Sequence, residues 1–170
     1  MTTLKELNKL AKECEICALK DSKSINQHLR ECNTCGEYHE KAEVFNQTLS
    51  EVRKMASRSD DERHLALNKK LTEIASMDED MRLEAMSGLM DSISILPEAD
   101  RIKLVRTRTD VLTDFPKYTR NIVMDTMDTI MKDWDKERRR TEQNSVTKAT
   151  EDYPVLKKMM VRNMFGKMME

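Results

Sequence analysis

Four cysteines and two of the three histidines of the chain fall between residues 14 and 39. The cysteines form two Cys-x-x-Cys pairs, Cys14 with Cys17 and Cys32 with Cys35. A two-residue gap lets both thiolates of a pair reach one metal ion, and a structural zinc site takes four such ligands in tetrahedral geometry. The spacing therefore predicts a closed zinc site near the N-terminus, with these four cysteines as its simplest ligand set.

His28 adds a fifth candidate ligand. If residues 25–32 are helical, His28 and Cys32 lie four residues apart and face one side. A second possible ligand set is therefore His28, Cys32 and Cys35 with one upstream cysteine. A third is Cys14, Cys17, His28 and Cys32. Cys32 belongs to every set.

Two other chemistries suit paired cysteines. Two disulfides would use the same residues, but no signal peptide opens the chain and no apolar run could cross a bilayer. We therefore expect a cytoplasmic protein with reduced thiols. Iron sites with four thiolate ligands tend to lie in glycine-rich loops. Gly36 is the only glycine between residues 14 and 39, so we prefer zinc as the metal. We expect His39 and His64 to be solvated on helix faces.

The string HLRECNTC, from His28 to Cys35, followed by a predicted helix, resembles the zinc-containing anti-sigma factors. The resemblance covers residues 14–45 and implies a zinc finger that serves a transcription regulator. The string CEIC…INQHLREC is also similar to the Cys-Cys-His-Cys fingers of DNA-repair proteins that bind ubiquitin.

Composition indicates an all-α protein. The 170 residues contain 30 Lys+Arg and 31 Asp+Glu, so net charge gives no reason to favour nucleic acid or a membrane as partner. Charged residues make up 36% and aromatic residues 4%, with three glycines and three prolines. High charge with few turn-forming residues is typical of helices whose solvent faces carry ion pairs.

An internal repeat follows the cysteine-rich segment. Five arginines are each nineteen residues apart: Arg63, Arg82, Arg101, Arg120 and Arg139. Apolar residues recur three, four, eleven and fourteen positions after each of the first four arginines, an arc of about 100° on a helix. We therefore expect tandem helices of about four turns, started by proline or by a capping aspartate. The column at eleven comprises Ile74, Ile93, Leu112 and Met131.

The repeating arginine lies near the positive end of its own helix dipole, where a cation is unfavourable. Each arginine should therefore have a partner, most simply Glu79 for Arg82 and Glu98 for Arg101, three residues earlier. We favour such structural ion pairs over a row of arginines that binds an acidic ligand.

These patterns predict four regions. Residues 1–57 form a zinc-binding helical module, with a long helix from about residue 37 to 57. Residues 58–140 form a four-helix repeat domain, either a bundle or a short helical stack. Residues 141–152 are a polar linker. Residues 153–170 form a Met-rich amphipathic helix that either completes the core or binds a partner, and its scattered apolar positions argue against membrane-surface contact.

The chain lacks a Gly-rich phosphate loop, a Ser-His-Asp set and an HExxH motif. A zinc ion with four protein ligands has no open position for a substrate. We therefore predict a non-enzymatic zinc-binding protein that binds another protein as an adaptor or accessory subunit. The alternatives are an anti-sigma-like transcription regulator and a ubiquitin- or nucleic-acid-binding zinc finger.

Overall fold

The computed structural model describes residues 6–13 and 33–166, which are helical apart from short connections and contain no strand. The all-α prediction is confirmed. A helix over residues 6–13 is followed by α3 (Asn33–Ala56), α4 (Asp60–Ser76), α5 (Glu79–Ser94), α6 (Glu98–Asp114), α7 (Lys117–Lys132), α8 (Lys136–Ala149) and α9 (Val155–Phe165). Among these helices, none is long and apolar enough to cross a membrane.

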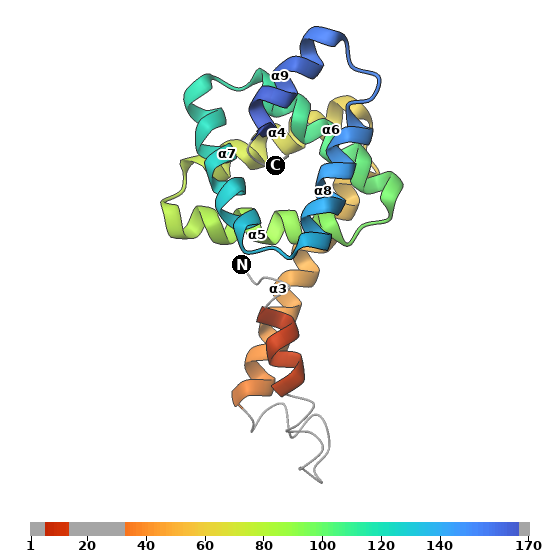
Figure 1. Cartoon of the computed structure of the whole chain (residues 1–170). Coiled ribbons are helices and arrows are strands. Elements are labelled where there is room, and N and C mark those ends of the chain that lie inside the picture. Colours follow the sequence, from red (N-terminus) through yellow and green to blue (C-terminus); the bar gives the residue numbers. More distant parts are fainter. Residues whose placement is uncertain (1–5, 14–32, 167–170) are drawn as a thin grey trace.

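The helices from α4 to α9 wind around a ring, with the first part of α3 projecting from it (Figure 1). Each helix packs most extensively on the helix two places later: α3 on α5, α4 on α6, α5 on α7, and α6 on α8. Consecutive helices touch less. The arrangement is a stack of two interleaved series, α3–α5–α7 and α4–α6–α8, and not an up-and-down bundle. α9 follows as the last helix and packs on α6.

The nineteen-residue repeat sets where each helix begins. The residue at the arginine position donates its backbone N–H to the carbonyl of the N-cap residue, at 2.9–3.1 Å in every helix from α4 to α9. The N-caps are nineteen residues apart: Ser59, Asp78, Pro97, Pro116, Asp135 and Pro154. The four predicted units correspond to α4–α7, and α8 and α9 continue the same register.

The linker predicted for residues 141–152 is wrong over most of its length, because α8 extends to Ala149. The helix starts at Asp135, whose side chain accepts a hydrogen bond from the Arg138 N–H at 2.8 Å. Its inner face then buries Glu142, Ser145, Val146 and Ala149. Two of these four residues are polar, which is why the segment does not show an apolar periodicity.

The predicted apolar columns form the core. The column at eleven is confirmed, since Ile74, Ile93, Leu112 and Met131 are 0–4% exposed. In α3 a stripe through Phe45, Leu49 and Val52 is buried. Val44 is 41% exposed, because it lies one residue, about 100°, away from the buried line.

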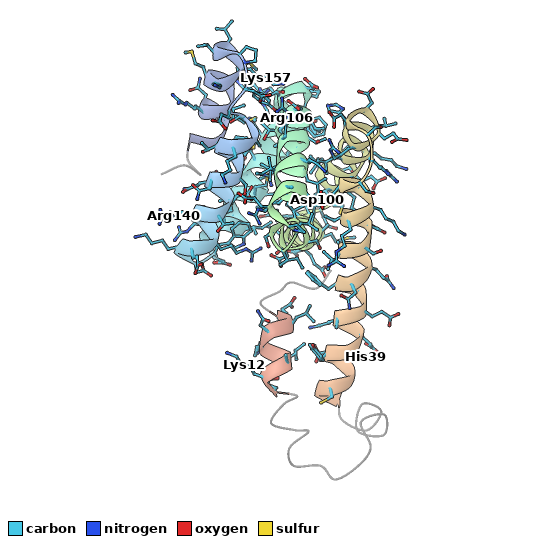
Figure 2. All side chains as sticks on the ribbon, turned by 90° about the vertical axis from the view of Figure 1, so that its right-hand side faces the viewer. Lys12, His39, Asp100, Arg106, Arg140 and Lys157 are labelled. Atoms are coloured by element: carbon cyan, nitrogen blue, oxygen red, sulfur yellow. The ribbon has the colours of Figure 1, made fainter. Side chains whose placement is uncertain are left out.

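The first half of α3 runs beside the helix over residues 6–13 and away from the ring (Figures 1 and 2). Leu7 and Leu10 are buried, and Leu7 belongs to the main core. Lys41 pairs with Glu6 across the two helices, with Nζ and Oε1 3.9 Å apart. α3 starts at Asn33, earlier than predicted, so Cys35 and Gly36 lie inside the helix.

Candidate functional site

Four of the five candidate metal ligands, Cys14, Cys17, His28 and Cys32, lie outside the described residues. The fifth, Cys35, lies in the first turn of α3 and is only 2% exposed. His39, which we expected outside the site, is exposed on the same helix. Over residues 6–13 and 33–166, no three metal-binding side chains come together. The zinc site therefore stays a prediction.

The surroundings of Cys35 suit a zinc-bound thiolate. The helix over residues 6–13 ends one residue before Cys14, and α3 begins one residue after Cys32. These two ends lie together at the tip of the projecting pair (Figures 1 and 2). N–H groups in the first turn of a helix stabilise a negative charge, which lowers the cost of deprotonating a thiol there.

The repeating arginines join alternate helices by the same hydrogen bonds, which we call the arginine staple. Arg63 Nε donates to Thr107 Oγ1 at 2.9 Å, and Arg82 Nε donates to Thr126 Oγ1 at 3.1 Å. Arg101 Nε donates to Ser145 Oγ at 3.1 Å. Each hydroxyl residue lies 44 residues after its arginine, on the helix two places later. Each hydroxyl in turn donates to the backbone carbonyl four residues before its own position.

The staple also explains how a cation is tolerated at a helix N-terminus. Nη1 of each arginine reaches back to the end of the preceding helix, where carbonyls lack helical partners. Arg82 donates to Met77 O at 2.8 Å, and Arg101 donates to Leu96 O at 3.3 Å. Each guanidinium thus lies at the negative end of one helix dipole while its backbone starts the next helix.

The predicted partners of these arginines are therefore wrong for two of them. Arg82 and Arg101 form no ion pair with Glu79 or Glu98 in the described part of the chain; Glu98 pairs instead with Lys148 of α8. Arg63, for which no partner was named, does pair with the acid three residues earlier, Asp60, in addition to its staple.

The staple ends at Arg120. The position 44 residues later is Met164, which has no hydroxyl, and the Arg120 guanidinium forms no hydrogen bond or ion pair with the described residues. Arg120 is half-buried and lines a groove of about 400 Å³ between α7 and α9. Met124, Met160 and Met164 line the same groove, with Asp125 and Asp128 on its α7 wall.

A second repeated contact joins helices three places apart. Asp91 of α5 pairs with Arg138 of α8, whose guanidinium lies 3.8 Å from the centroid of Trp134. Nineteen residues later, Asp110 of α6 pairs with Lys157 of α9 at 2.6 Å, and Lys157 lies 4.4 Å from the centroid of Tyr153. The Tyr153 hydroxyl also donates to Asp110 at 2.5 Å. Burial, with this hydrogen bond, raises the pKa of Tyr153 and keeps it protonated.

The recurrence of this contact assigns it a structural role. Asp91, Trp134 and Arg138 line a groove of about 1340 Å³ between the helix over residues 6–13 and α5, α7 and α8. Because Asp91 and Arg138 already pair with each other, they offer a ligand little unpaired charge.

One buried ion pair occupies positions that are apolar in the neighbouring units of the repeat. Arg108 of α6, 1% exposed, pairs with Glu142 of α8. Arg108 stands seven residues after Arg101, where the neighbouring units have Leu89 and Met127. Glu142 stands three residues after Arg139, where the other units have Ala or a larger apolar residue. The pair therefore replaces two core contacts between α6 and α8 with one ionic contact.

The outer face of α9, defined by Val155, Leu156, Met159 and Met160, is apolar and exposed. Their side chains are 74%, 77%, 55% and 51% exposed. The equivalent positions nineteen residues earlier in α8 are all polar: Lys136, Glu137, Arg140 and Thr141. Arg140 points away from the stack in Figure 2. The inner side of α9 is also apolar and buries Val161 and Phe165.

Sequence reasoning missed the partners of the arginines, although their signal was present. Thr107, Thr126 and Ser145 are spaced by nineteen residues just as the arginines are. Arg108 and Glu142 could have been found as charged residues at positions where the neighbouring units have apolar residues. Pro154 follows Asp135 by nineteen residues and marks α9 as a further unit.

Comparison with known proteins gives no match, because no family model, no curated protein and no solved structure resembles this chain significantly.

Proposed function

We propose that this chain is a non-enzymatic, zinc-binding helical protein that binds another protein, as an adaptor or accessory subunit, through the outer face of α9. The observation that supports this most is the set of four exposed apolar residues at positions that are polar in α8. Terminal units of a helical stack normally carry a polar outer face. An exposed apolar cluster at such an end is typical of an interaction surface.

The zinc site has a supporting role in this proposal. One candidate ligand, Cys35, lies in α3, and the other four lie in the chain between the helix over residues 6–13 and α3. A metal ion there would fix the ends of the two helices, and binding would be coupled to their folding. The stack carries the partner-binding face at the opposite end of the molecule (Figure 1).

The partner-binding proposal is tested by two matched double variants of the full chain. Leu156→Ser with Met159→Ser makes the outer face of α9 polar, and Glu137→Ser with Arg140→Ser changes the equivalent positions of α8. We expect the α9 variant to lose the stoichiometric partner that co-purifies from the native cells, while thermal unfolding is unchanged. The α8 variant should keep it. Retention of that partner by the α9 variant would contradict the proposal, and a sigma factor as the partner would favour the anti-sigma alternative.

Metal content is measured separately by elemental analysis of the purified protein. We expect one zinc ion per chain, and we expect Cys32→Ser to lose it, because Cys32 belongs to every possible ligand set. A protein without bound metal, whose folding Cys32→Ser does not change, would contradict the zinc assignment and leave the α9 proposal standing.

A further inference from the structure

The groove between α7 and α9 is continuous with the outer face of α9, since Met160 belongs to both. We infer that these surfaces together bind an amphipathic helix of a partner protein whose apolar side is flanked by carboxylates. The inference rests on the proposed function and specifies the chemistry of the partner.

The shape and residue types of this surface suit a helix. Leu156 and Met159 are exposed beside Met160, and Met164 continues the apolar line into the groove of about 400 Å³. Methionine side chains are flexible and adapt to the side chains that pack on them. Recognition of an amphipathic helix by an apolar groove uses residues with this spacing along the helix.

The charges around the surface favour an acidic partner. α9, Val155–Phe165, contains Lys157, Lys158 and Arg162 and no acidic residue. Lys157 is held by Asp110, whereas Lys158 and Arg162 form no ion pair with the described residues. A second copy of α9 would bring the same cations against each other, so self-pairing through this face is unfavourable. A helix flanked by carboxylates would complement them.

Arg120 gives the groove its most specific feature. Three equivalent arginines bind a hydroxyl of the helix two places later, and Arg120 faces Met164 instead. Its half-buried guanidinium therefore offers N–H groups to a carboxylate, a pairing that is stronger than a neutral hydrogen bond. Because Asp125 and Asp128 line the α7 wall, we expect the carboxylates of the partner to lie over Arg120 and α9.

The test measures binding of the full chain to three labelled synthetic helical peptides by fluorescence anisotropy. One peptide has a leucine face flanked by glutamates, the second has lysines in place of the glutamates, and the third has the first composition in scrambled order. We expect the glutamate peptide to bind at least about tenfold more tightly than the others, and its affinity to fall as salt is raised. Equal binding of the lysine peptide would overturn the inference.

Matched variants assign the contact to Arg120. Arg120→Gln should weaken binding of the glutamate peptide by about tenfold, whereas Arg139→Gln, the same repeat position in α8, should leave it unchanged. Circular dichroism checks that both variants stay folded. The inference would be overturned if Arg120→Gln left the affinity unchanged. It would also be overturned if the chain bound anionic phosphatidylglycerol vesicles more tightly than the peptide. A third contradicting outcome is self-association of the chain that Leu156→Ser with Met159→Ser removes.

These outcomes separate the inference from the proposed function. If the native partner is lost with the α9 double variant but kept with Arg120→Gln, the face binds a partner and the acidic chemistry is wrong. If the α9 double variant and Arg120→Gln both keep the native partner, the proposed function and the inference are both wrong.

Discussion

Helices α8 and α9 are the last two units of one repeat, and they are held to the stack in different ways. α8 contacts α6 largely through polar groups: Arg108 with Glu142, Arg101 with Ser145, and Glu98 with Lys148. α9 buries Val161 and Phe165. The outer sides of the two helices also differ, because α8 exposes polar residues and α9 exposes apolar ones.

The difference shows that the repeat fixes the backbone and leaves the chemistry of each face to individual residues. Both helices start with the same hydrogen bond, from Arg139 N–H to Asp135 O and from Lys158 N–H to Pro154 O. A helix with a polar outside, such as α8, leaves no apolar surface there for a partner to cover. A helix that is apolar on both sides has more apolar surface than its own stack covers, which is the basis of the proposed function.

The largest effect on stability is expected from breaking the buried ion pair between α6 and α8. Glu142→Ala leaves Arg108 buried without a partner, and we expect a loss of about 3–5 kcal/mol in the free energy of unfolding. Arg108→Met with Glu142→Val restores the apolar residue types found at the equivalent positions Met127 and Val123. Chemical denaturation should find this double variant at least as stable as the parent. A double variant as unstable as Glu142→Ala would show that the site cannot accept an apolar pair.

A second pair of substitutions separates the two sides of α9. Phe165→Ala empties a buried position and should cost about 3–5 kcal/mol in the free energy of unfolding. Leu156→Ala acts on a side chain that is exposed in the unbound chain, so its effect should stay within about 0.5 kcal/mol. Thermal or urea unfolding measures both. Similar losses for the two variants would mean that Leu156 is covered within the chain itself.

The fold was predictable from sequence to the extent that it depends on the apolar columns. Ile74, Ile93, Leu112 and Met131 lie where the nineteen-residue period placed them. The apolar columns could not be followed into α8, because Glu142 and Ser145 occupy inner positions there. A search for apolar residues does not find positions that are buried as part of an ion pair or of the arginine staple. The partners of Arg82 and Arg101 were missed because a search within one helix cannot find a hydroxyl two units away.

The candidate site was less accessible from sequence. A methionine-rich C-terminal helix was expected, with core and binding roles left open; the structure buries Val161 and Phe165 on its inner side and leaves an apolar outer side exposed. The unpaired Arg120 becomes visible only when Met164 is compared with Thr107, Thr126 and Ser145. That comparison needs the three-dimensional contact first, because the shared nineteen-residue spacing does not by itself say which hydroxyl each arginine contacts.

A smaller effect on stability is expected when one arginine staple is removed from the interior of the stack. Thr126→Val removes the oxygen that accepts from Arg82 Nε and should cost about 1–3 kcal/mol in the free energy of unfolding. Thr129→Val is the control, since its hydroxyl is exposed and donates only to Asp125 O of its own helix. Equal effects of the two substitutions would deny the staple any role in stability.

The smallest expected effect is a pH dependence of the exposed ion pairs that join α6 to α8 and to the residues after it. The hydrogen bond from Lys148 lowers the pKa of Glu98, and the hydrogen bond from Arg106 lowers the pKa of Asp152. A carboxyl whose pKa is lower in the folded state contributes stability above its unfolded pKa and loses it as pH falls through the folded value. The free energy of unfolding should therefore decrease as pH falls below about 4.5.

The double variant Glu98→Gln with Asp152→Asn assigns this pH dependence to the two pairs. It should show a shallower decrease of the free energy of unfolding on acidification than the parent, measured by urea denaturation at a series of pH values. Asp61→Asn, which changes an exposed carboxylate outside these pairs, should leave the slope of the parent unchanged. Because both pairs are exposed, added salt should also reduce the difference between parent and double variant. An identical slope in all three proteins would mean that α8 is held in place by its buried contacts alone, with Arg108 and Glu142 as the principal ones.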